Sequence, residues 1–133
     1  MSFSKEERAA MKERARELKS AADGESAVRD ALAKMTPHDR AIGKRLHALV
    51  KDAAPELSPK TWYGMPAYAN KDGKVVLYFR DAGKFKERYS MLGFQDTSNL
   101  DAGSMWPVAY ALTSKLTKAD EAKIAKLVKQ ALS

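Results

Sequence analysis

Two segments of the chain carry hydrophobic residues at helical spacing behind a capping residue. The first begins at Thr36-Pro37, which place a cap hydroxyl and a proline at the start of a helix. The second begins at Thr117, with Asp120 at the position that completes a capping box. The pattern predicts amphipathic helices over 37–53 and 117–132, whose apolar positions are Ile42, Leu46, Leu49, Val50 and Ala53 in one and Ile124, Leu127, Val128 and Ala131 in the other.

Between these helices the pattern changes to that of β-strands. Asn70 to Gly73 separate two apolar segments, 67–69 and 75–79, and the Asp72-Gly73 pair tolerates the positive φ of a tight hairpin turn. The second segment is apolar on both faces, which is typical of a central strand. Further strands are expected over 88–94 and 108–112, where small Ala109 and Ala111 leave room for a helix. The expected fold is α+β, an antiparallel sheet with helices 37–53 and 117–132 packed on one face.

Residues 1–36 differ from the rest of the chain. Ser4 and Glu7 have capping-box spacing, which predicts a helix over 5–22, and Asp23-Gly24 is expected to break the chain before a second short helix over 27–35. The large apolar residues of the first helix are only Met11 and Leu18, so little of it is expected to be buried. We therefore divide the chain into an N-terminal helical extension, 1–36, and an α+β domain, 37–133. The extension either pairs with a second copy or is solvated, which leaves monomer and homodimer open.

Composition narrows the class of protein. The 133 residues include no cysteine, which excludes disulfides and thiolate metal sites. No apolar segment approaches the roughly 20 residues that span a bilayer, and the N-terminal residues lack the apolar centre of a secretory signal. We therefore expect a cytoplasmic protein with no membrane association. The net charge of +7 favours anionic partners, and it is spread along the chain without a basic tail.

The residues favour a binding domain over an enzyme. Both histidines, His38 and His47, lie outside the aromatic region and are interpreted as surface residues, so no activated nucleophile can be named. Asp96 and Asp101 flank polar residues that are typical of a turn. No glycine-rich phosphate-binding motif occurs. No catalytic or metal-binding residue is assigned.

The aromatic residues suggest a binding site instead. All but Phe3 lie between positions 62 and 110, and helices on one face of a sheet need only one set of inward side chains. Some aromatic side chains should therefore form a solvent-accessible pocket beside the bend at Gly64 and Pro66. We expect Arg80 or Arg88 at its rim to orient an anionic group of a small anionic or aromatic ligand, and the following residues to line it: Trp62, Met65, Tyr68, Tyr89 and Trp106.

The segment 80–89 offers an alternative function. Its four cations are interleaved with Phe85 and Tyr89, an arrangement that can contact phosphates while a ring stacks on a base. Two acidic residues reduce its net charge to +2, which favours a solvated loop over a nucleic-acid site. Nucleic-acid binding is thus the second alternative to a ligand-binding domain.

Three stretches resemble the YdhG-like family, a bacterial domain of unknown function also described as iron-chaperone-like because one branch is compared with frataxin. They are Trp62-Tyr63-Gly64-Met65-Pro66-Ala67-Tyr68 with the following hairpin, Tyr89 to Phe94, and Trp106 to Leu132. The resemblance covers about Pro37 to the C-terminus. It implies a compact α+β domain without assigned catalytic residues, and iron binding through surface carboxylates as the first alternative function. Iron fits this chain poorly, because Asp39, Asp52 and Glu56 are interspersed with basic residues.

Overall fold

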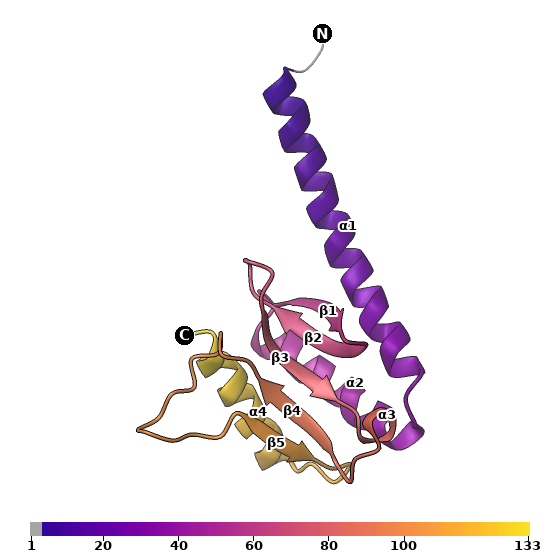
Figure 1. Ribbon diagram of the computed structural model, residues 1–133, viewed down its shortest axis with the longest axis vertical. Helices are drawn as coiled ribbons and strands as arrows, with labels where there is room; N and C mark the ends of the chain where they lie inside the picture. Colours follow the sequence, from indigo (N-terminus) through magenta and orange to yellow (C-terminus); the bar gives the residue numbers. More distant parts are fainter. Residues whose placement is uncertain (1–3) are drawn as a thin grey trace.

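The computed structural model describes residues 4–133, except the side chains of 13, 14 and 16–22 (Figure 1). Five antiparallel strands form one sheet whose spatial order, β1-β2-β3-β4-β5, follows the chain. The helices are α1 (Lys5–Ala33), α2 (Pro37–Ala53), α3 (Ala82–Phe85) and α4 (Lys118–Ala131), and the strands are β1 (Ser58–Trp62), β2 (Met65–Ala69), β3 (Val75–Arg80), β4 (Ser90–Phe94) and β5 (Ala109–Leu112). The expected α+β class is confirmed.

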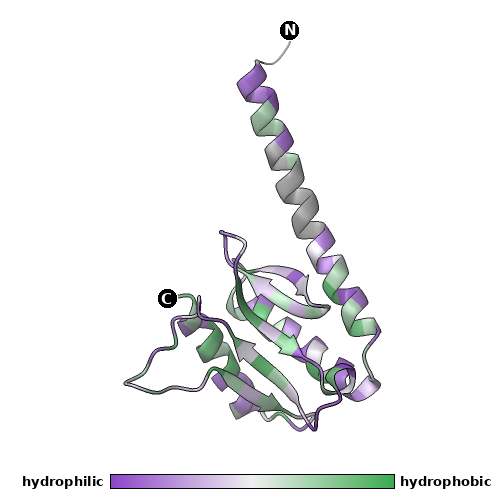
Figure 2. Cartoon of the chain, in the orientation of Figure 1, coloured by the Kyte–Doolittle hydropathy of each residue, from purple (hydrophilic) through white to green (hydrophobic). Residues whose placement is uncertain are grey.

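The predicted local signals account for the element boundaries. Ser4 and Thr117 both form complete capping boxes, at the starts of α1 and α4, and the Thr36 hydroxyl accepts the Asp39 N–H at the start of α2. The hairpin between β2 and β3 turns at Asn70, whose side chain accepts two backbone N–H groups, and at Gly73, which has a φ of 79°. As predicted, β3 is the central strand. Figure 2 shows the hairpin tip as hydrophilic and β3 as hydrophobic.

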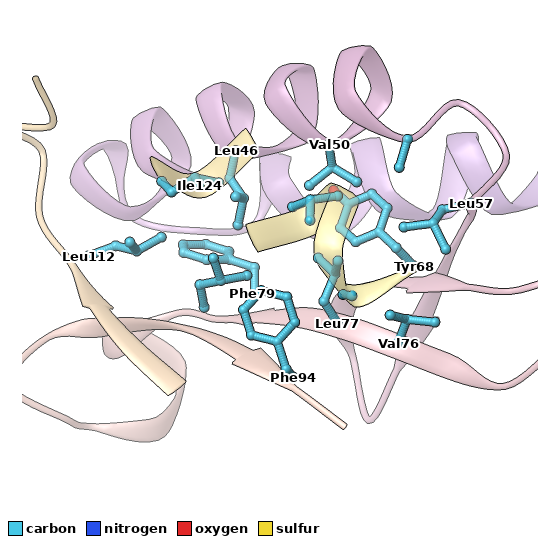
Figure 3. Close-up of a cluster of buried hydrophobic side chains, with 14 of the residues drawn as sticks. Leu46, Val50, Leu57, Tyr68, Val76, Leu77, Phe79, Phe94, Leu112 and Ile124 are labelled. Atoms are coloured by element: carbon cyan, nitrogen blue, oxygen red, sulfur yellow. The ribbon is translucent and has the colours of Figure 1, made fainter. Parts of the chain in front are cut away.

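The core lies between the sheet and the helices (Figure 3). Leu46 and Val50 of α2 and Ile124 of α4 pack over Leu77 and Phe79 of β3. The Arg45 guanidinium pairs with the Glu121 carboxylate and joins α2 to α4 at the surface. No helix in the described part of the chain is long and apolar enough to cross a membrane.

The expected break at Asp23-Gly24 is wrong, because α1 continues through it as one helix of 29 residues. Gly24 is buried against β1: a Cβ atom at this position would lie 2.0 Å from the carbonyl oxygen of Pro59. The glycine therefore allows the helix backbone to approach the strand backbone, and it does not terminate the helix.

The last turns of α1 contribute to the common core. Val28 and Leu32, together with Met35 directly after the helix, belong to the same buried cluster as the side chains of α2 and the sheet. The residues of 1–36 that follow Gly24 thus pack on the domain, whereas Met11 is 52% exposed. The side chain of Leu18 lies outside the described residues.

The small residues of β5 do not receive a helix. Ala109 pairs with Gly93 and Ala111 with Met91, which places both alanines on the face of the sheet opposite the core, where they are exposed. Tyr110 and Leu112 point to the core face instead. The predicted alternation of large and small residues is present, but the face that carries the two alanines points away from the helices.

Two opposing effects determine how the replacement of Gly24 by alanine changes the free energy of unfolding. Helix propensity alone would favour Gly24→Ala by about 1 kcal/mol. The new methyl group collides with the Pro59 carbonyl, so we expect a net loss of about 1–3 kcal/mol in the free energy of unfolding, measured in urea. Ser26→Ala, at an exposed position of the same helix, is the control and should change stability by less than about 0.5 kcal/mol. A more stable Gly24→Ala protein would contradict this packing.

Candidate functional site

The bend that the sequence places at Gly64 and Pro66 is a two-residue hairpin turn between β1 and β2. Trp62 pairs with Met65, so Tyr63 and Gly64 form the loop. Their φ values are 51° and 75°, and two positive φ values in a two-residue loop are those of a type I′ turn. Glycine adopts this conformation freely, whereas a tyrosine in the left-handed region carries strain. The tyrosine side chain is nevertheless 78% exposed.

Three aromatic side chains, Trp62, Tyr63 and Tyr78, form what we call the aromatic surface. The Trp62 ring lies 5.0 Å from that of Tyr63, edge to face, and 5.3 Å from that of Tyr78, measured between centroids. A Cβ atom on Gly93, the β4 partner of Tyr78, would lie 2.2 Å from the Tyr78 ring. The absence of a side chain on Gly93 therefore lets the tyrosine ring lie across the neighbouring strand.

The structure separates the residues that were expected to line one pocket. Tyr68 and Met65 are buried, with 1% and 4% of their surface exposed, and Tyr68 belongs to the core because it faces the helices. Trp106 packs against the core directly before β5, at the sheet edge opposite β1. Of the expected residues only Trp62 contributes to the aromatic surface, and Tyr63 and Tyr78 were missed.

Three of the four cations of segment 80–89 contact neighbouring groups. Arg80 pairs with the Glu87 carboxylate and stacks over the Phe85 ring, with 3.8 Å from its guanidinium carbon to the ring centroid. The Arg88 guanidinium lies 5.2 Å from the exposed Tyr89 ring. Lys84 Nζ donates to the carbonyl oxygen of Tyr63 at 3.0 Å, which ties α3 to the hairpin turn. The segment is thus a folded turn around α3.

A cleft of about 720 Å³ lies beside the hairpin turn. We call it the turn cleft. Its walls come from three separate parts of the chain: residues between 27 and 36 at the end of α1, Thr61 and Gly64 of the hairpin, and Asp81, Gly83 and Lys84 around α3. A hollow thus exists beside the predicted bend, but none of the expected aromatic or arginine residues lines it.

Two buried carboxylates near this cleft were missed as site residues. Asp39 is 3% exposed and accepts from the Gly83 N–H at 2.9 Å and from the Ser90 hydroxyl at 3.1 Å. Asp81 is also 3% exposed: Oδ2 accepts the Lys84 N–H at 3.3 Å, and Oδ1 has no hydrogen-bond partner. Sequence patterns marked Asp39 as one of the carboxylates considered for iron, and they gave no signal that either Asp39 or Asp81 is interior.

His47 is not the solvated residue that its basic neighbours suggested, because α1 covers that side of α2. Nδ1 lies 2.7 Å from the Tyr68 hydroxyl and Nε2 lies 2.9 Å from Glu25 Oε1. The carboxylate can only accept, so Nε2 carries a hydrogen and donates to Glu25, while Nδ1 shares a hydrogen bond with the tyrosine hydroxyl. Burial, and to a smaller extent the charge of Glu25, raises the pKa of Tyr68 well above its ordinary value. These contacts join α1, α2 and β2. The Tyr68 hydroxyl is buried within them and is therefore not a surface nucleophile.

His47 also lines a second hollow, of about 540 Å³, between α1 and α2. Arg40 is at this hollow, and its guanidinium donates to the carbonyl oxygens of Leu32, Ala33 and Met35 at the end of α1. The arginine therefore caps the helix C-terminus. Among the residues searched, which are those the structure describes, no three histidine or acidic side chains come together in a way that could hold a metal ion.

The strain at Tyr63 predicts an unusual result for its replacement. Tyr63→Asn creates Asn-Gly, a pair strongly preferred in type I′ turns, and should leave the free energy of unfolding unchanged or raise it by up to about 1 kcal/mol. Tyr63→Val, β-branched in the same conformation, should lower it by about 1–2 kcal/mol. Urea unfolding of the two variants measures both effects. A marked loss in Tyr63→Asn would show that the phenol ring stabilises the fold.

The contacts of Glu25 predict a pH dependence. Partial burial raises the pKa of Glu25, but hydrogen bonds and charge from His47 and Lys51 outweigh it, so the pKa is lowered overall. A carboxylate with a lowered pKa in the folded state stabilises the fold above its unfolded pKa, and this contribution is lost as the pH falls through the folded pKa. Between pH 5 and pH 3, wild type should therefore lose more stability than Glu25→Gln. Glu56→Gln, at an exposed position, is the control, and equal slopes for all three proteins would contradict the assignment.

Comparison with known proteins adds no relative. No protein-family model matches the chain, and no curated protein and no solved structure matches it either. The motifs that resemble the YdhG-like family therefore stand on the sequence alone, and the aromatic surface and the turn cleft are judged on their own geometry.

Proposed function

We propose that the protein is a binding domain that holds a small ligand with a flat ring and an anionic group on the aromatic surface. The observation that carries the proposal is Tyr63. Its backbone conformation costs about 1 kcal/mol or more for a residue other than glycine, and its side chain is 78% exposed. Burial of the ring contributes little in return, which favours a role in recognition.

The surroundings of the aromatic surface support a flat ligand. The helix-free face around Tyr78 carries small residues: Ala67 pairs with Tyr78 in one direction, Gly93 pairs with it in the other, and Ala109 follows Gly93. The Tyr78 ring is therefore flanked on both neighbouring strands by positions with little or no side chain. Aromatic side chains on such a face offer stacking partners for another ring.

The charge near the aromatic surface supports an anionic group on the ligand. Exposed Lys60 pairs with Ala67, so its side chain leaves the sheet on the same face as Tyr78. Lys84 lies at the turn through its contact with Tyr63. The expected anchor Arg80 is already engaged by Glu87 and Phe85, which leaves the two lysines as the nearer candidates.

The alternatives have less support. Iron binding would need converging oxygen ligands, and of the carboxylates considered for it Asp39 is buried and already hydrogen-bonded. Membership of the YdhG-like family and a cytoplasmic location remain proposals from the sequence. Nucleic-acid binding shares the stacking and charge chemistry and is tested below as a separate outcome.

The proposal is tested with adenosine 5′-monophosphate, which combines a flat ring with an anion. We expect quenching of tryptophan fluorescence and shifts of the Trp62, Tyr63 and Tyr78 amide signals, and weaker binding of uncharged adenosine. Trp106→Phe removes the other tryptophan, so that the emission reports Trp62. Absence of binding by both compounds at millimolar concentration would contradict the proposal.

Two variants locate the binding to the surface. Tyr63→Asn should weaken nucleotide binding about tenfold while keeping the fold, since stacking contributes about 1–3 kcal/mol for each ring. Gly93→Ala should weaken it by displacing the Tyr78 ring without removing an aromatic residue. Tyr89→Ala is the matched control, and an equal loss there would contradict the assignment. Much tighter, salt-sensitive binding of a single-stranded oligothymidylate would show that the aromatic surface binds nucleic acid and not a small ligand.

A further inference from the structure

The turn cleft combines one buried carboxylate with exposed side chains of both charges, two lysines and one aspartate. Four charged side chains line it: Asp30 and Asp81, and Lys34 and Lys84. Asp81 is 3% exposed, whereas both lysines are exposed. Among the ion pairs of the described residues, none joins any two of these four side chains.

The buried carboxylate of the cleft lacks a cation. Oδ1 of Asp81 is buried and has no donor, whereas Oδ2 accepts the Lys84 N–H. Asp39 lies directly behind Gly83, where a Cβ atom would be 3.0 Å from Oδ2, and its own partners are a backbone N–H and a hydroxyl. A buried carboxylate without a cation or a full set of donors is costly, so Asp81 favours a ligand that brings a positively charged donor.

The two lysines favour an anion. Lys34 is the C-cap residue of α1 and Lys84 belongs to α3, so the two lysines come from different walls of the cleft. A ligand carboxylate between these walls would gain charge-assisted hydrogen bonds while its ammonium group lies deeper. The volume of about 720 Å³ is in the usual range for a small-molecule site.

We propose that the turn cleft binds a small zwitterion, an amino acid or short peptide with free amino and carboxyl groups, with its ammonium at Asp81 and its carboxylate between Lys34 and Lys84. This site is separate from the aromatic surface, since its lining includes none of Trp62, Tyr63 and Tyr78. It does not depend on the ligand proposed for that surface. The two sites meet at the hairpin turn and share Lys84, which is a candidate contact for an anionic group in both.

The test uses the full chain and three dipeptides: alanyl-alanine, its N-acetylated form and its C-terminal amide. We expect alanyl-alanine to shift the amide signals of Gly64, Gly83 and Lys84, and each blocked form to bind at least about tenfold more weakly, as expected for loss of a charged hydrogen bond. No shift at these amides with millimolar alanyl-alanine would overturn the proposal. Equal binding of the blocked forms would overturn it as well.

Two variants assign the ends of the ligand. Asp81→Asn keeps an acceptor at the start of α3 and removes the charge, and we expect at least about a tenfold loss of alanyl-alanine binding. Lys34→Gln should reduce the preference for the free carboxylate over the amide. Lys44→Gln, exposed on α2 and outside the cleft, is the control. Unchanged binding in Asp81→Asn would overturn the proposal, and if this variant does not fold, the dipeptide comparison on the unmodified protein decides.

Discussion

The carboxylate of Asp39 is the contact on which the arrangement around the hairpin turn depends. It lies in the first turn of α2 and holds the backbone of α3 through Gly83 and the start of β4 through Ser90. Because α3 is fixed in this way, Lys84 reaches the carbonyl of Tyr63 and Asp81 faces the cleft. A single buried group thus positions residues from three parts of the chain. Its burial is compatible with stability because both of its oxygens accept hydrogen bonds.

The fold could be predicted to the extent that it is encoded locally. The caps at Ser4, Thr36 and Thr117 and the hairpin at Asn70 depend on residues only a few positions apart, and all were confirmed. Gly24 was misread because its role depends on Pro59, a residue far along the chain that packs on it. A glycine that allows a close approach and a glycine that ends a helix look identical in a single sequence.

The site could be predicted only in part. The distinctive run around Gly64 coincides with an unusual backbone feature, a two-residue turn in which Tyr63 and Gly64 both have positive φ. Which rings face solvent could not be predicted: Tyr68 and Tyr78 lie in neighbouring strands with similar patterns, yet one faces the helices and the other the open side. The burial of His47 gave no signal, since it comes from α1, which lies elsewhere in the chain.

The order of the strands has a consequence for how the molecule assembles. Every strand pairs only with its neighbours along the chain, so the sheet can form by successive closure of local loops, which is the rapid route in folding. The docking of α1 on β1 and the tie between Asp39 and Ser90 join segments that lie farther apart in the sequence, so closing them costs more chain entropy. The cleft beside the hairpin is therefore built from the long-range contacts of the fold, whereas the sheet beside it is built from shorter-range ones.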